Sequence, residues 1–237
     1  MSDFASVGLA LLGGILPALA WLWFWRREDS RNPEPRRLIA LAFFAGMVTV
    51  AAVIPIQKFV APLLGSTTII FIVWSVIEEA AKYIAARITV LRQADYDEPI
   101  DAVIYMITIA LGFAAVENAL FLLSPLAGDN VLSTILTGNL RFVGATLLHV
   151  LSSGAIGLAL ALSFYKSRRT KSYFAIGGVI LAAVLHSFFN FLILNTQDEN
   201  VYRTFALVWI GVVALLAILE FVKRTQKPIN QYRTIKR

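Results

Sequence analysis

The chain has 237 residues, of which 58% are hydrophobic and only 15% carry a charged side chain. Soluble globular domains average about 25% charged residues, so this chain has too few polar residues to cover a water-soluble surface. It contains no cysteine, which excludes disulfides, thiolate metal sites and cysteine nucleophiles. The net charge of +6 does not indicate nucleic-acid binding, because the lysines and arginines gather in short blocks beside apolar segments, as topology signals do.

Apolar segments of about 20 residues, the length that crosses a bilayer as a helix, follow one another along the chain. In order they are Phe4–Trp25, Leu38–Val60, Thr68–Ile88, Asp101–Leu123, Phe142–Tyr165, Tyr173–Leu194 and Arg203–Val222. The first does not have the pattern of a cleaved signal peptide, because its basic block follows the apolar run instead of preceding it. The sequence therefore predicts an all-α, polytopic transmembrane helical bundle with about seven membrane helices.

The connections between these segments alternate in charge. The basic ones are Arg26–Arg37, Lys166–Ser172 and the tail Lys223–Arg237, and on the same side Arg87–Pro99 holds two arginines among acids. The neutral or acidic ones are Ala61–Thr67, Ser124–Leu140 and Asn195–Tyr202. By the positive-inside rule the N-terminus lies outside and the C-terminus in the cytoplasm. Ser124–Leu140 is expected to lie along the outer interface as a short helix, with Arg141 at headgroup depth. We expect a single integral membrane domain, 1–237, that ends in a basic cytoplasmic tail, 223–237.

Three ionisable residues, Glu78, Glu79 and Lys82, lie in the middle of the third apolar segment. An ionised residue near a helix centre costs about 2.5–3.5 kcal/mol, whereas each Ile, Leu, Phe or Val returns about 0.3–0.6 kcal/mol. Such residues are tolerated only where they face a polar interior, which makes them candidates for a functional site. Because Lys82 shares a helix face with both acids, it can neutralise one glutamate and leave the other for chemistry.

Other polar residues fall at the same depth. Counted at about 1.5 Å per residue, the outer half of the bilayer contains Glu78, Glu79, Glu117, His149, His186 and Asn190. His149 and His186 are the only histidines of the chain. Phe113 lies one turn before Glu117 and would form an aromatic wall beside it. This convergence from four segments predicts one site inside the bundle.

A stripe of small residues, Ser153, Gly157 and Ala161, runs along the fifth segment. Small residues at this spacing allow close packing of membrane helices. We therefore assign the stripe to helix packing.

Two kinds of chemistry suit this set of residues. A carboxylate in an apolar environment can act as a general base near neutral pH, and a histidine with an asparagine can donate hydrogen bonds to a developing oxyanion. This would hydrolyse peptide bonds without a serine or cysteine nucleophile. Alternatively, two glutamates and two histidines are a reasonable ligand set for Zn²⁺. The sequence leaves the metal-free and the metal-dependent mechanisms open.

Three motifs in this region carry a resemblance to a known family. Glu78 to Lys82 matches EExxK, Phe113 to Glu117 matches FxxxE, and His186 to Asn190 matches HxxxN. With His149 between the last two, the chain resembles the PrsW family of intramembrane proteases, which are relatives of the CAAX prenyl protease superfamily. The prenyl-protease branch has EExxxR and FxxxH, whereas this chain has Tyr83 and Glu117 at those places. The resemblance covers residues 68–195.

The resemblance implies a membrane-embedded endopeptidase of the bacterial plasma membrane. It implies that the enzyme cleaves a single-pass membrane protein near the outer leaflet, such as an anti-sigma factor at site 1. By this resemblance Glu78 is the base that activates water, helped by Glu117. Roles are likewise implied for Glu79, oriented by Lys82, for His186 and Asn190 as the oxyanion site, and for His149 as a water or metal contact, with Phe113 and Arg141 in support. The cofactor would be none, or one divalent cation such as Zn²⁺.

Alternatives remain at this stage. A proton- or cation-coupled transporter could use the same Glu and His cluster, although the sequence has no inverted repeat and no pair of Gly/Pro-broken helices. A hydrolase of lipid or amide bonds could use the same activated water. A non-catalytic scaffold would tolerate Glu78→Gln and His186→Ala. The expected partners are the protein substrate and membrane lipid, without nucleic acid, and the sequence does not indicate an oligomeric state.

Overall fold

The computed structural model describes residues 3–27, 32–127, 144–194 and 201–224. Within these ranges the elements are helices and no strand occurs, which confirms the predicted all-α class. The α-helices are α1 (Asp3–Arg26), α2 (Arg36–Val60), α3 (Thr67–Thr89), α4 (Pro99–Ala127), α6 (Thr146–Leu162), α7 (Arg168–Leu194) and α8 (Val201–Arg224). A short 3₁₀ helix, η1 (Ala61–Leu63), follows α2 directly.

Five of the helices in the described ranges are long and apolar enough to cross a membrane. These spans are Phe4–Arg26, Arg36–Leu63, Pro99–Leu123, Arg168–Leu192 and Ala206–Arg224. The other two predicted spans differ for physical reasons, because α3 carries the charged Glu78, Glu79 and Lys82 and α6 has only 17 residues. The chain is therefore a multi-pass membrane protein, in which α3 is more polar and α6 is shorter than the other helices.

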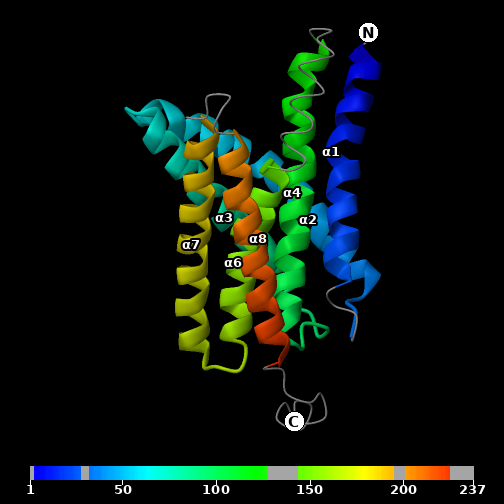
Figure 1. Cartoon of the computed structure of the whole chain (residues 1–237), viewed down its shortest axis with the longest axis vertical. Helices are drawn as coiled ribbons and strands as arrows, with labels where there is room; N and C mark the ends of the chain where they lie inside the picture. Colours follow the sequence, from blue (N-terminus) through cyan, green and yellow to red (C-terminus); the bar gives the residue numbers. More distant parts are fainter. Residues whose placement is uncertain (1–2, 28–31, 128–143, 195–200, 225–237) are drawn as a thin grey trace.

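The helices run alternately up and down the bundle (Figure 1). The last turns of α1, α3, α6 and α8 lie at the lower end of Figure 1, so all the described basic connections lie at one end of the molecule. Which side of the membrane this end faces stays a prediction from the positive-inside rule. The predicted interface helix over Ser124–Leu140 falls mostly, and Arg141 entirely, outside the described residues.

Helix α4 is the centre of the bundle and packs against α1, α2 and α6. Its contact with α2 is a contact between backbones. A Cβ atom on Gly112 would overlap the carbonyl oxygen of Phe43, and one on Gly46 would overlap that of Ile109. Any larger residue at either glycine would push the two helices apart. This close crossing brings the second half of α2 beside the part of α4 that carries Glu117.

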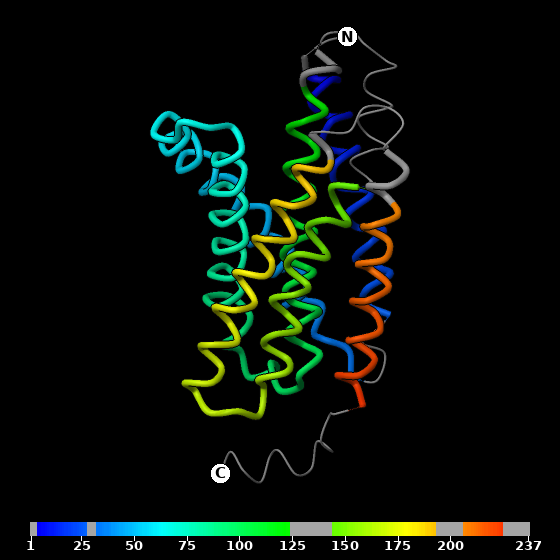
Figure 2. Tube along the Cα trace, turned by 60° about the vertical axis from the view of Figure 1, so that its left-hand side comes forward, coloured from blue at the N-terminus to red at the C-terminus, as the bar shows by residue number. Residues whose placement is uncertain are grey.

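The boundaries of three helices differ from the predicted segments by three residues or more. Helix α6 ends at Leu162 and not at Tyr165, α7 begins at Arg168 and not at Tyr173, and α4 continues to Ala127. Hydropathy marks where the apolar residues end, whereas backbone hydrogen bonding continues a helix into polar residues such as those at the start of α7. The connection between α6 and α7 is therefore a tight turn (Figure 2).

Candidate active site

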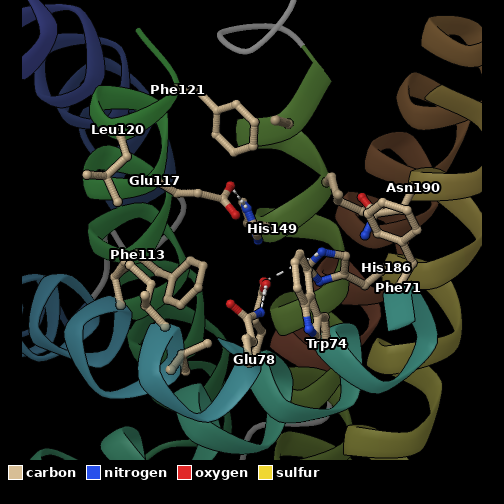
Figure 3. A pocket seen from close by; sticks show the side chains of 16 residues that line it. Phe71, Trp74, Glu78, Phe113, Glu117, Leu120, Phe121, His149, His186 and Asn190 are labelled. Atoms are coloured by element: carbon tan, nitrogen blue, oxygen red, sulfur yellow. Dashed lines mark hydrogen bonds and ion pairs between the residues drawn. The ribbon is translucent and has the colours of Figure 1, made fainter. Parts of the chain in front are cut away.

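A cavity of about 540 Å³ lies between α2, α3, α4, α6 and α7. Figure 3 shows the side chains that line it. Aromatic rings form much of its wall, including Phe71 and Trp74 of α3 and Phe113 of α4. Its polar side chains are Gln57, Glu78, Glu117, His149, His186 and Asn190. The structure thus brings five of the six predicted catalytic residues to one cavity, and the sixth, Glu79, lies directly behind it.

Glu79 is completely buried, and both of its carboxylate oxygens are hydrogen-bonded. Its Oε1 lies 2.8 Å from Nζ of Lys82 and 2.8 Å from Nδ1 of His186. Its Oε2 accepts a hydrogen bond of 2.7 Å from Oγ of Ser153. A carboxylate that is paired and bonded in this way can stay charged inside a protein. Glu79 therefore acts on its neighbours, which it holds in place.

Lys82 links the Glu79 carboxylate to His149. Its Nζ lies 2.9 Å from Nδ1 of His149, and it also lies 4.2 Å from the ring centroid of Phe113. Because a lysine ammonium only donates hydrogen bonds, Nδ1 of His149 must accept. The imidazole proton is then on Nε2, which lies 3.0 Å from Oε2 of Glu117 and donates to it. The bonds thus form a chain from the buried Glu79 to Glu117 at the cavity.

Glu78 has a different environment from its neighbour. Its Oε1 accepts a hydrogen bond of 2.8 Å from Nε2 of Gln57. Its Oε2 is buried and has no hydrogen-bond partner among the described residues, and it lies 3.7 Å from Nε2 of His186. Since Nδ1 of His186 donates to Glu79, its Nε2 presents a lone pair. A buried acceptor without a partner is costly, and here Oε2 of Glu78 is such an atom and faces the lone pair of Nε2 of His186.

Glu78, His149 and His186 could together hold a metal ion. Each offers one ligand atom, and these atoms all lie within 4.8 Å of one another. Three protein ligands of the carboxylate and imidazole kind, with one position left open, are typical of catalytic zinc sites. Oε2 of Glu78 and Nε2 of His186 have lone pairs as they stand, and Nε2 of His149 gains one when metal binding releases one proton from the Lys82–His149 pair and leaves the hydrogen between them on Nδ1. The residues therefore fit one divalent cation.

The remaining predicted residues have weaker contacts. Asn190 lines the cavity, and its Nδ2 lies 3.5 Å from Oγ of Ser75. Phe113 lines the cavity as well, with its ring centroid 5.3 Å from that of His149. Arg141 lies outside the described residues. No contact here tests the predicted oxyanion role of Asn190.

Two residues of the site were missed by the sequence analysis. Gln57 is the single amide of the apolar helix α2 and is followed directly by Lys58, and this pair of polar residues in an apolar helix was the available signal. Ser153 was assigned only to helix packing, although it lies one turn after His149 on the same face of α6. Packing does occur on this stripe, because a Cβ atom on Gly157 would lie 2.7 Å from Cα of Val103 in α4.

The fold and the site define a class of protein, a polytopic helical membrane protein with a carboxylate and histidine cluster inside the bundle. Residues 34–219 match the family described as PrsW family intramembrane metalloprotease, and the chain belongs to this family. It is therefore a membrane-embedded peptidase. This membership decides against the carrier and scaffold alternatives.

Bacterial relatives named Protease PrsW agree with this assignment. The protein of Bacillus subtilis (strain 168) is 26% identical over 186 residues, which cover 76% of this chain and 80% of the relative. That of Geobacillus kaustophilus (strain HTA426) is 25% identical over 195 residues, 80% of this chain and 81% of the relative. That of Oceanobacillus iheyensis is 24% identical over 208 residues, which cover 86% of this chain and 92% of the relative. No solved structure matches the chain with significance.

Proposed function

We propose that the chain is a metal-dependent endopeptidase that cleaves a single-pass membrane protein, such as an anti-sigma factor, inside the outer half of the bilayer. The observation that carries the proposal is the unpaired Oε2 of Glu78, which faces Nε2 of His186 across a cavity that also contains His149. A ligand that accepts lone pairs from both atoms would remove the cost of burying them.

In this mechanism Glu78, His149 and His186 hold one divalent cation. When bound, such a cation polarises the scissile carbonyl and makes water a better nucleophile at neutral pH. Glu117 carries the proton. Its carboxylate accepts a proton from the attacking water, whose oxygen bonds to the carbonyl carbon, and it returns that proton to the amide nitrogen as the carbon–nitrogen bond breaks. This assigns the base to Glu117, in place of the Glu78 that the family resemblance implied.

The buried residues behind the cavity have a positioning role in this proposal. Glu79 fixes the ring of His186 through Nδ1, and Lys82 fixes the ring of His149 through Nδ1. Partners on the second ring nitrogen commonly orient histidines that ligate metals. Asn190, at the rim of the same cavity, would position the substrate carbonyl.

The substrate must be locally unwound at the cavity. The carbonyls of an α-helix are already hydrogen-bonded, and a helix with its side chains is about 10–12 Å across. A helical segment therefore has no free carbonyl for the site and is too wide to enter the cavity. An extended segment could place apolar side chains against Phe71, Trp74 and Phe121, which line the cavity.

The test is to measure metal content and cleavage together. Wild type, Glu78→Gln and His186→Ala are purified and assayed in liposomes against a panel of single-pass membrane proteins. Glu220→Gln, an exposed change on α8, is the control. We expect one bound divalent cation and cleavage in wild type and Glu220→Gln, and loss of both in the two site variants. Chelation should stop cleavage, and added metal should restore it.

Two outcomes would contradict different parts of the proposal. Cleavage by a metal-free preparation that survives a chelator would show that activated carboxylates suffice. Cleavage of no single-pass protein by a metal-loaded wild type would show that the substrate class is wrong.

The predicted membrane side can be tested separately. The chain has no cysteine, so a single cysteine placed in Lys166–Ser172 is the only site for a thiol reagent. An impermeant reagent should label it only after the cells are opened. Labelling in intact cells would reverse the orientation and move the cavity to the cytoplasmic half.

A further inference from the structure

A second cavity, of about 410 Å³, lies at the opposite end of the bundle from the candidate active site. It is formed by the last turns of α3, the connection to α4, the end of α6 and the start of α7. In Figure 2 these segments meet at the lower end of the molecule. Its lining residues with polar groups are Tyr83, Arg87, Tyr96, Arg168, Lys171 and Ser172. No acidic residue of the described part of the chain lines it.

The two arginines of this basic pocket have no acidic partner in the described part of the chain. Within the described ranges neither Arg87 nor Arg168 forms an ion pair or hydrogen bond with another side chain. Lys171 is partly buried and lies 5.2 Å from the ring centroid of Phe164. Three positive side chains are brought together here from α3 and α7, of which Arg87 and Arg168 are exposed and Lys171 is half-buried, and like charges repel one another. An anion in the pocket would turn that repulsion into attraction.

The surface beside the pocket is apolar and exposed. On α3, Ile84 and Ile88 are 56% and 62% exposed, and on α7, Ile176 is 59% exposed. In a membrane protein such side chains face the lipid acyl chains. A ligand that has both an anionic phosphate and acyl chains would therefore satisfy the pocket and the neighbouring surface together. Basic pockets between membrane helices commonly bind the headgroups of anionic lipids.

We propose that the basic pocket binds the phosphate group of an anionic membrane lipid, whose acyl chains lie along Ile84 and Ile88. Arg87 and Arg168 contact the phosphate oxygens, since arginine donates paired hydrogen bonds to phosphate. The lipid thus joins the end of α3 to the start of α7. These are the two helices that carry Glu79 and His186, so bound lipid also stabilises the bundle around the site.

The experiment measures thermal unfolding and lipid binding in detergent micelles, without any need for a protease assay. Short-chain phosphatidic acid is added to wild type and to the double variant Arg87→Gln/Arg168→Gln. The matched control is Arg92→Gln/Arg169→Gln, which removes the same charge from exposed neighbouring residues that do not line the pocket. Inorganic phosphate and short-chain phosphatidylcholine are tested in parallel.

We expect phosphatidic acid to raise the unfolding temperature of wild type and of the control, and to have little effect on the pocket variant. Two basic side chains near an anionic headgroup should change the lipid dissociation constant by about thirtyfold. Native mass spectrometry of the same proteins should find a tightly bound lipid on wild type and the control. This second measurement uses wild type, so it stays informative if the pocket variant folds poorly.

Three results would overturn the proposal. An equal rise of the unfolding temperature with phosphatidic acid in wild type, pocket variant and control would show only unspecific attraction of anionic lipid to a basic protein. An equal gain from inorganic phosphate would make the ligand a free anion and not a lipid. A gain from phosphatidylcholine that matches phosphatidic acid would show that the acyl chains act without the pocket.

Discussion

The two adjacent glutamates of α3 lie in contrasting regions of one site. Glu79 faces a bonded region, where Lys82, Ser153 and His186 satisfy both of its oxygens. Glu78 faces the cavity, where one oxygen has a partner in Gln57 and the other has none. Successive residues on a helix point about 100° apart, so two adjacent residues of α3 can face these two different regions. The comparison separates a carboxylate that is needed for structure from one that is left available for chemistry.

The largest expected effect is a loss of cleavage rate on replacing Glu117, which accepts and returns the proton at the cavity. Glu117→Gln should lower the cleavage rate by about 10²–10⁴-fold, because the amide cannot accept the proton of water. The fold should be unaffected, since the Glu117 side chain is 22% exposed and glutamine keeps an oxygen that can accept from His149. Rates in liposomes against Glu220→Gln measure this. An unchanged cleavage rate would mean that Glu78 is the general base and that Glu117 only orients His149.

The next largest effect should separate the two glutamates by stability. Glu79→Gln leaves the buried Lys82 without its counter-charge, and breaking a buried pair in this way costs about 3–5 kcal/mol. Glu78→Gln should change the unfolding free energy by less than about 1 kcal/mol, because its Oε2 has no hydrogen bond to lose. Both are measured by denaturant unfolding in micelles. Equal losses would mean that the two carboxylates are equally structural, which contradicts the comparison.

A smaller effect is expected from the serine that serves the bonded region. Ser153→Ala removes the partner of Glu79 Oε2 and should cost about 1–3 kcal/mol. Its neighbour is a matched control, because Ser152 is also buried but its Oγ has no hydrogen-bond partner in the described part of the chain. Ser152→Ala should therefore leave the unfolding free energy nearly unchanged. A loss of the same size in both variants would assign Ser153 to packing alone, as the sequence analysis did.

Much of this fold could be predicted from the sequence because the membrane simplifies the problem. Long apolar segments must be helices, and ionisable residues inside them must converge. That is why the sequence alone could predict that Glu78, Glu117, His149 and His186 lie close together, as they do around the cavity. The helix ends at Leu162 and Arg168 were missed, since hydropathy reports the apolar residues and not the backbone hydrogen bonds.

Contacts within the site were less predictable. The spacing of Lys82 allows a bond to either glutamate, and only the rotation of α3 within the bundle decides for Glu79. Gln57 was missed because helix α2 carries no acid or histidine that would have drawn attention to it. Its place beside Glu78 depends on the close crossing of α2 and α4 at Gly46 and Gly112, which no local pattern reveals.

A further buried acid extends the comparison to the basic end of the bundle. Glu34 lies in the connection before α2, is 5% exposed, and accepts a hydrogen bond from the hydroxyl of Tyr105. Burial raises the pKa of the Glu34 carboxyl above its ordinary value of 4.5, and the neighbouring Asp95 and Asp97 raise it further. This carboxyl is therefore easier to protonate in the folded protein than in the unfolded chain.

The smallest predicted effect follows from the sign of that shift. A carboxyl whose pKa is raised by folding contributes stability below pH 4.5, and this contribution is lost as the pH rises through the folded pKa. The unfolding temperature should thus fall with rising pH over this window, and Glu34→Gln should flatten the slope because the amide has no proton to lose. Glu220→Gln, at an exposed position on α8, is the control. A slope that stays unchanged in Glu34→Gln would mean that folding does not raise the pKa of Glu34, and would contradict the assignment of this pH dependence to its burial.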